Sequence, residues 1–297
     1  MSKFRGLGVA LVTPMKNGRV DFPALEKITA HVIEGGVDYL VALGTTGESV
    51  TLTSKECLAV FDCVKNINRG RLPVVAGYFG QNNTTALLDR IKEFDFEGFD
   101  GILSSSPSYN KPSQEGIYQH YMRVADASPL PVILYNVPGR TGSNVLPETT
   151  LRLAEAHNNI VAVKEASGDI VQGSQIIKHA PEGFDVLSGD DPTALGLMSC
   201  GGKGLISVIA NALPVQTNSM IQESLIGNFD KARERHLELL DFHKPLYADG
   251  NPAGIKGLLN LLGLCQTEVR LPLVPLKKET QEQLTRALRN MKSAAKA

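Results

Sequence analysis

The chain has 297 residues, of which 42% are hydrophobic and 21% charged, a composition typical of globular proteins. Its net charge of −1 provides no overall basic field to attract nucleic acid or anionic lipid, so we expect neither as a partner. The four cysteines follow neither a metal-ligand spacing nor a disulfide framework. No apolar run has the length of a membrane helix or of a signal-peptide core. We therefore expect a cytoplasmic protein that does not bind membranes.

Short apolar runs recur in the first three quarters of the chain, and each predicts a buried strand. They span residues 8–13, 39–43, 72–76, 101–105, 132–136, 160–164, 185–188 and 204–208. Most are separated by segments of helical periodicity, such as residues 22–34, 54–67, 85–94 and 115–127. Buried strands that alternate with helices indicate a parallel sheet. Eight such units predict an α/β fold of the (β/α)8 TIM barrel type rather than an open, doubly wound sheet.

The rest of the chain is helical in pattern. Residues 229–243, 252–262 and 279–295 have helical periodicity and are joined by turns that contain Pro and Gly. We therefore divide the chain into a (β/α)8 catalytic barrel at residues 1–227 and a C-terminal helical extension at residues 228–297. We expect no chemistry of its own from the extension.

The site of a (β/α)8 barrel forms at the carboxyl ends of its strands, so the polar residues found there are the candidates. After the second strand, residues 44–49 read Gly-Thr-Thr-Gly-Glu-Ser. The hydroxyls of Thr45 and Thr46 and the free backbone N–H groups of such a turn suit a bound carboxylate. The same pattern also fits a helix-capping turn. After the fourth strand, Tyr109 lies on a loop between two prolines, where an aromatic side chain often only packs.

The fifth and sixth strands end in residues whose side chains can take part directly in catalysis or bind an acid. Tyr135, at the end of the fifth, can act as a general acid and base when a cation or hydrogen bond assists it. Arg140 follows on a tight loop, and its planar guanidinium suits a carboxylate. Lys164 ends the sixth strand, where partial desolvation favours the free amine that attacks carbonyls. By itself, Lys164 better fits a lysine whose stem covers apolar surface.

The seventh strand ends with Gly189 and Asp190, and the eighth contains Ile206. The strand ends together carry an amine, a phenol, two threonine hydroxyls and a guanidinium, a set that suits an α-keto acid with a second acid beside it. The chain has no phosphate-binding loop, dinucleotide fingerprint or His-Glu-x-x-His motif. We expect no metal and no cofactor, only a covalent Schiff base through Lys164.

Five segments resemble the family of pyruvate-dependent class I aldolases and lyases that contains the dihydrodipicolinate synthases. They are residues 44–49, 135–142, 163–168, 187–191 and 204–208. The similarity covers nearly the whole chain, with the motifs in family order. The Arg-Thr-Gly that begins at Arg140, together with residues 110–114, is typical of the synthases. The resemblance implies condensation of pyruvate with L-aspartate-4-semialdehyde, a step of lysine and diaminopimelate biosynthesis.

The resemblance also implies catalytic roles. Lys164 would form the Schiff base with pyruvate, and Tyr135 would donate and accept protons. Thr45 and Tyr109 would extend Tyr135 into a proton relay, with Tyr109 reaching into the site of a neighbouring subunit. A donated tyrosine implies at least a dimer, and the family is commonly a homotetramer built from two dimers.

The remaining candidates would bind the substrates. Thr46 and Ile206 would contact pyruvate, and Arg140 would hold the carboxylate of aspartate-4-semialdehyde. Gly189 and Asp190, at the end of the seventh strand, complete the predicted substrate-binding set.

The chain departs from the lysine-inhibited members of the family at their effector pocket. Ser54 and Cys57 stand where those proteins carry two histidines, Ala86 replaces a glutamate, and Ser108 replaces an aromatic residue. Loss of the carboxylate removes the group that would pair with the ammonium of lysine. We predict weak or absent inhibition by lysine.

Two other functions compete with the synthase. A sister aldolase, such as N-acetylneuraminate lyase or a 2-keto-3-deoxy sugar acid aldolase, would share Lys164 and Tyr135 but would have less need of Arg140. A catalytically silent barrel would bind a metabolite or a partner and would need no reactive amine.

Overall fold

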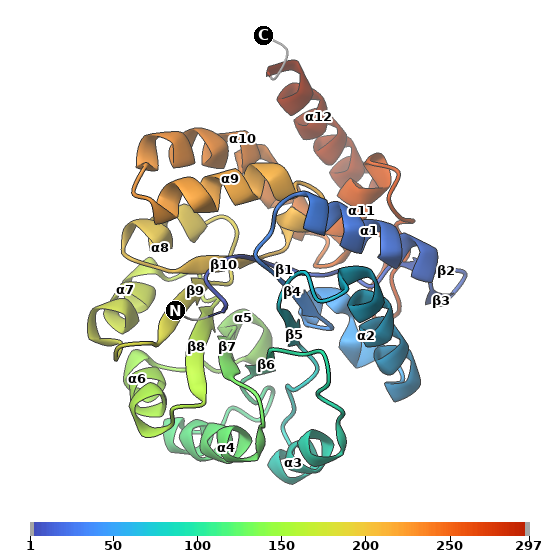
Figure 1. Cartoon of the computed structure of the whole chain (residues 1–297). Coiled ribbons are helices and arrows are strands. Elements are labelled where there is room, and N and C mark those ends of the chain that lie inside the picture. The colour runs from blue at the N-terminus through green and yellow to red at the C-terminus, as the bar shows by residue number, and fades with distance from the viewer. Residues whose placement is uncertain (1–2, 295–297) are drawn as a thin grey trace.

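The computed structural model describes residues 3–294 and contains a closed barrel of eight parallel strands (Figure 1). The strands are β1 (Gly6–Ala10), β4 (Tyr39–Ala42), β5 (Val74–Ala76), β6 (Gly101–Ser105), β7 (Val132–Asn136), β8 (Ile160–Glu165), β9 (Asp185–Ser188) and β10 (Gly204–Ser207). Each pairs with the next, and β10 pairs back to β1. The predicted α/β fold, a (β/α)8 TIM barrel, is confirmed, and the bounds of β6, β7 and β9 match the predicted ranges.

Helices surround the barrel because the connections between parallel strands return along its outside. They are α1 (Phe22–Glu34), α2 (Ser54–Asn68), α3 (Thr84–Glu93), α4 (Gln114–Ala127), α6 (Pro147–Ala156), α7 (Ile170–His179), α8 (Ala194–Ser199) and α9 (Pro214–Leu225). The four-residue helix α5 (Pro138–Thr141) lies instead in the connection that directly follows β7. Helix α1 shows how the sequence dictates this arrangement. Leu25, Ile28 and Val32 of α1 recur on one helical face and are buried. Asp21 caps the helix by accepting a hydrogen bond from the backbone N–H of Ala24 at 3.2 Å.

The alternation of side chains along each strand divides the core into two clusters. On β7, Ile133 and Tyr135 point into the barrel interior, where they join an apolar cluster with Ala162 and Ile206. Leu134 points outward into the larger cluster between the sheet and the helices. This alternation decides which strand-end residues face the interior, and it places Tyr135 there.

A small hairpin precedes α1 and was absent from the sequence prediction. Its strands are β2 (Met15–Lys16) and β3 (Arg19–Val20), which pair antiparallel. Asn17 and Gly18 form the turn with φ angles of 54° and 75°. An Asn-Gly pair with positive φ at both positions is the preferred two-residue hairpin turn, so the signal was present in the sequence.

Three further helices follow the barrel: α10 (Phe229–Ala248), α11 (Ala253–Leu261) and α12 (Lys278–Ala294). Figure 1 shows α10 lying along α9 and α12 projecting at the edge of the molecule. Helix α10 is longer than predicted, because it continues through Pro245. The division into residues 1–227 and 228–297 stays a prediction, and its outermost residues, like residue 295 of the last predicted helix, lie outside the described range. Within residues 3–294, no helix combines the length and the hydropathy that crossing a bilayer requires.

Candidate active site

Lys164 and Tyr135 meet at the carboxyl ends of two adjacent strands. They are paired residues in the parallel ladder of β7 and β8. The Nζ atom of Lys164 lies 4.4 Å from the centroid of the Tyr135 ring, within the range of a cation–π contact. Lys164 is only 5% exposed, and among residues 3–294 its Nζ has no carboxylate partner. The amine is therefore buried, next to a phenol and uncommitted to an ion pair.

Gly189, at the end of β9, packs directly against the stem of Lys164. Its backbone N–H donates to the carbonyl of Glu165 at 2.7 Å. A Cβ atom at position 189 would stand 2.6 Å from Cβ of Ala166 and 2.9 Å from Cγ and Cε of Lys164. Only glycine leaves room for the lysine in this orientation. The predicted substrate-binding residue Gly189 thus shapes the site by the side chain that it lacks.

Glu165 lies next to Lys164 in the sequence but on the opposite face of β8, where it is buried. Its carboxylate accepts hydrogen bonds from Nδ2 of Asn136 at 2.9 and 3.1 Å, from Nε2 of Gln172 at 2.9 Å and from the backbone N–H of Ser167 at 2.8 Å. These charge-assisted bonds tie the ends of β7 and β8 to α7. We did not predict this network, although three polar residues at buried positions are its signal.

Residues 44–49 do not begin a helix. They form the 3₁₀ turns η1 (Thr45–Gly47) and η2 (Ser49–Thr51), with Glu48 between them in the left-handed conformation. Helix α2 begins later, with Thr53 and Glu56 as its capping box. The capping alternative for residues 44–49 is therefore wrong.

Within this turn, the two threonine hydroxyls differ in environment. Thr46 is buried, and its Oγ1 accepts a hydrogen bond from Nδ2 of Asn251 at 3.0 Å. Thr45 is half-buried, and its hydroxyl has no hydrogen-bond partner within the described residues. The hydroxyl of Thr45 is thus free to contact a ligand, whereas that of Thr46 is already oriented by Asn251.

Tyr109 lies on the loop that follows β6, and Arg140 lies in the short helix α5 that follows β7. The backbone N–H of Tyr109 donates to the carbonyl of Thr141 at 3.0 Å, which joins the Tyr109 loop to α5, where Arg140 lies. Arg140 is exposed, and its guanidinium has no partner among residues 3–294. Tyr109 is 90% exposed with a φ of 69°, so its ring points away from the chain's own core. Neither side chain contacts Lys164 in the single chain.

Ile206 of β10 is fully buried in the interior cluster that contains Tyr135.

The residues that follow β9 and β10 are held by hydrogen bonds to the carboxylates of Asp190 and Asp191. Asp190 accepts a hydrogen bond from Oγ1 of Thr193 at 2.7 Å. Asp191 accepts one from Oγ of Ser207 at 2.6 Å, and it also accepts bonds from the backbone N–H groups of residues 208 and 209. Asp190 thus orients a local turn, while Asp191 fixes the end of β10.

The extension also reaches these strand ends, through contacts that the sequence analysis did not predict. Tyr247 of α10 donates to Asp191 at 3.1 Å. Burial, with the nearby carboxylate of Asp191, raises the pKa of the Tyr247 phenol, so this hydroxyl remains a neutral donor. Asn251 donates to Thr46, and Lys256 of α11 forms a buried ion pair with Glu48. Local patterns could not show these contacts, since they join segments far apart in the sequence.

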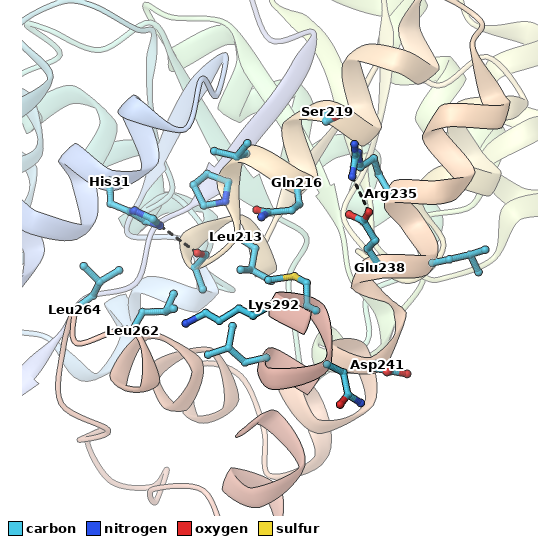
Figure 2. A pocket seen from close by; sticks show the side chains of 17 residues that line it. His31, Leu213, Gln216, Ser219, Arg235, Glu238, Asp241, Leu262, Leu264 and Lys292 are labelled. Atoms are coloured by element: carbon cyan, nitrogen blue, oxygen red, sulfur yellow. Dashed lines mark hydrogen bonds and ion pairs between the residues drawn. The ribbon is translucent and has the colours of Figure 1, made fainter. Parts of the chain in front are cut away.

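A groove of about 1030 Å³ lies outside the barrel, between α1, α9, α10 and α12 (Figure 2). Leucines 213, 262 and 264 line it, together with the ion pair of Arg235 and Glu238, whose charged atoms are 2.6 Å apart. None of the predicted site residues lines this groove. Among residues 3–294, no group of three or more His, Cys, Asp or Glu side chains is placed to hold a metal ion. The carboxyl ends of the strands therefore define the candidate active site.

Comparisons with known proteins agree with this geometry. A family model described as the dihydrodipicolinate synthetase family matches residues 3–291. A relative from Parabacteroides distasonis, named 4-hydroxy-tetrahydrodipicolinate synthase, is 48% identical over 288 residues, or 97% of each chain. The crystal structure of dihydrodipicolinate synthase from Thermotoga maritima has a TM-score of 0.95 at 41% identity and covers 98% of this chain and 99% of that one. The chloride-inhibited synthase from Acinetobacter baumannii, complexed with pyruvate, has a TM-score of 0.93 at 40% identity, with coverage of 97% and 98%.

Proposed function

This chain belongs to the dihydrodipicolinate synthetase family, and we propose that it condenses pyruvate with L-aspartate-4-semialdehyde. It is a lyase of the class I aldolase type, with the activity of a 4-hydroxy-tetrahydrodipicolinate synthase in lysine and diaminopimelate biosynthesis. The observation that carries the Schiff-base chemistry with pyruvate is the buried, unpaired amine of Lys164 beside the phenol of Tyr135. The exposed guanidinium of Arg140 supports the semialdehyde as the second substrate. The pyruvate bound to the Acinetobacter baumannii synthase supports the choice of pyruvate.

The reaction begins at Lys164. Its neutral amine attacks the C2 carbonyl of pyruvate, and the resulting carbinolamine loses water to form an iminium ion. We assign the carboxylate of pyruvate to the turn at Thr45 and Thr46, whose hydroxyls and backbone N–H groups suit an anion. The site needs no metal and no other cofactor for this step, since the protonated imine is itself the electron sink.

Carbon–carbon bond formation follows. Loss of a proton from C3 converts the iminium into an enamine, and the enamine carbon attacks the aldehyde carbon of the semialdehyde. The amino group of the semialdehyde then attacks C2, closes the ring and displaces the amine of Lys164. Arg140 offers a free, exposed guanidinium for the carboxylate of the semialdehyde. One water is released overall.

Proton transfer is assigned to Tyr135. Its ring lies beside the amine of Lys164, with 4.4 Å between Nζ and the ring centroid, and a phenol next to the reacting amine can serve as a general acid and base. Thr45 and Tyr109 would pass the proton onward to solvent. Since Tyr109 is exposed on its own chain, we assign its side chain to the active site of a second copy. The active enzyme is then at least a dimer. We propose that two such dimers form a tetramer.

Two experiments test the proposal. A coupled assay should show turnover with pyruvate and aspartate-4-semialdehyde and none with N-acetylneuraminate or 2-keto-3-deoxy sugar acids; the reverse preference would assign the chain to a sister aldolase. Light scattering should give the mass of a dimer or a tetramer. Active monomers would contradict the donation of Tyr109. We further propose that the enzyme acts in the cytoplasm.

A further inference from the structure

We propose that Lys256, in the C-terminal extension, is a positioning residue that fixes the pyruvate-binding turn through Glu48. This inference rests on the proposed function, because it concerns the turn that carries Thr45 and Thr46. Lys256 does not touch the reacting atoms. Its effect passes through the carboxylate of Glu48, which lies in the same turn as the two threonines.

The ion pair between Lys256 and Glu48 is buried completely. The side chain of Lys256 is 0% exposed and that of Glu48 is 1% exposed. Nζ of Lys256 donates to Oε1 of Glu48 and, at 2.8 Å, to the carbonyl of Glu268. The other oxygen of Glu48 accepts the backbone N–H of Arg270 at 3.1 Å. Both carboxylate oxygens are therefore held by residues that follow the barrel.

Glu48 is well placed to transmit this constraint. Its backbone is left-handed, with a φ of 53° and a ψ of 29°, a conformation that is uncommon for a residue with a side chain and costs free energy. Its N–H donates to the carbonyl of Thr45 at 3.1 Å, and its carbonyl accepts from the N–H of Thr51 at 2.9 Å. A change in the backbone of Glu48 would therefore move Thr45 and, with it, Thr46.

Two more contacts from the extension fall on the same segment. Asn251 donates to the hydroxyl of Thr46 at 3.0 Å. The guanidinium of Arg270 donates to the carbonyl of Thr51 at 3.0 Å and to both oxygens of Glu56 at 2.5 and 2.9 Å. The turn is thus held by Asn251, Lys256 and Arg270.

Burying the ion pair of Lys256 and Glu48 costs desolvation free energy that apolar side chains would not require. Burial lowers the pKa of the Lys256 ammonium even though Glu48 opposes this change. A buried ion pair seldom stabilises a protein more than apolar residues of the same volume do. Removal of one partner, however, leaves the other charge buried and unpaired, which destabilises the fold. What the pair does supply is a defined position for Glu48. A purely structural pair would be replaceable by neutral residues with no effect on pyruvate binding.

Three variants separate positioning from stability: Lys256→Met, Glu48→Gln and the double variant. The probe is the pyruvate concentration that gives half-maximal borohydride trapping at Lys164, measured beside the melting temperature. Each single variant should melt at a lower temperature because it leaves one buried charge unpaired. The double variant has no unpaired charge and should recover much of the melting temperature. Its half-saturating pyruvate concentration should remain at least about tenfold above that of the wild type, because the turn is no longer fixed.

The matched control is Ile91→Ala on α3, which removes a buried side chain outside the turn. This variant should have a lower melting temperature but the same half-saturating pyruvate concentration as the wild type. Recovery of both melting temperature and pyruvate dependence in the double variant would overturn the positioning role. The double variant also carries the test if Lys256→Met does not fold. Absence of any adduct in the wild type would instead refute the proposed function, and this inference with it.

Discussion

Lys164 and Tyr135 are paired residues on adjacent strands, and the Nζ of the lysine stands 4.4 Å from the centroid of the tyrosine ring. Parallel pairing in register places both side chains at the same height in the barrel, and the alternation along β7 and β8 turns both inward. The phenol can therefore serve the atoms that react at the amine. This relationship links the sequence motifs to a Schiff-base mechanism.

Replacement of Arg140 by alanine should weaken use of aspartate-4-semialdehyde and leave trapping of pyruvate intact. Loss of a charge-assisted contact to a carboxylate should lower kcat/KM for the aldehyde by about tenfold to a hundredfold. Steady-state kinetics with each substrate varied in turn would measure this. Arg233→Ala, which removes an exposed guanidinium from α10, is the matched control. Equal losses for both substrates would mean that Arg140 has another role.

Gly189→Ala should displace the side chain of Lys164. The new Cβ would approach Cγ and Cε of the lysine to 2.9 Å, so the amine must move. We expect the rate of pyruvate trapping to fall by at least about tenfold, with a loss of about 1–3 kcal/mol in stability from overpacking. Gly139→Ala is the control, because a Cβ there meets no atom within 4 Å. An unchanged trapping rate in Gly189→Ala would show that Lys164 tolerates the displacement.

Lysine should not inhibit this enzyme at low-millimolar concentrations. Ala86 presents no carboxylate to an ammonium, and Ser108 is engaged with Asn82 through hydrogen bonds of 2.6, 2.8 and 3.2 Å. Cys57 is buried. Initial rates measured across a lysine titration would test this, with a lysine-inhibited member of the family assayed in parallel. A clear fall in rate at low-millimolar lysine would contradict the prediction.

His120 should make the fold sensitive to mild acid. Burial lowers the pKa of His120 to about 4. The unfolded chain, where a histidine has a pKa of about 6.5, binds a proton first, so the free energy of unfolding should fall as the pH drops from about 6.5 towards 4. The contribution reaches about 3 kcal/mol at most.

Denaturant unfolding as a function of pH would measure the effect of His120. The variant His120→Gln should lose that part of the pH dependence. In contrast, His179→Gln, at an exposed position, should keep the wild-type slope. Identical slopes for the wild type and His120→Gln would disprove the assignment.

Much of the barrel could be predicted because local patterns determine it. Runs of apolar residues marked the strands, and the rule that barrel sites form at strand ends selected Lys164 and Tyr135. Helix α10 was predicted to end at His243, two residues before a proline. The helix instead continues through Pro245, which is buried.

The parts of the site that could not be predicted depend on contacts between residues far apart in the sequence. Nothing near Glu48 in the sequence indicates that Lys256, 208 positions later, would neutralise it. The left-handed backbone of Glu48, which ends the turn Thr45–Gly47, was also not predicted, because glutamate seldom adopts that conformation. A lone lysine in the apolar run of α11 was the available signal, and it would have indicated a buried partner without naming which carboxylate.

Borohydride reduction in the presence of pyruvate, followed by peptide mapping, tests the central claim most directly. Borohydride converts the iminium into a stable secondary amine, so the mass of one pyruvate-derived group should appear on the peptide that contains Lys164. The variant Lys164→Arg should show no adduct, since a guanidinium forms no Schiff base under these conditions. An adduct on another lysine, or no adduct on the folded wild-type protein, would contradict the assignment of Lys164 as the covalent nucleophile.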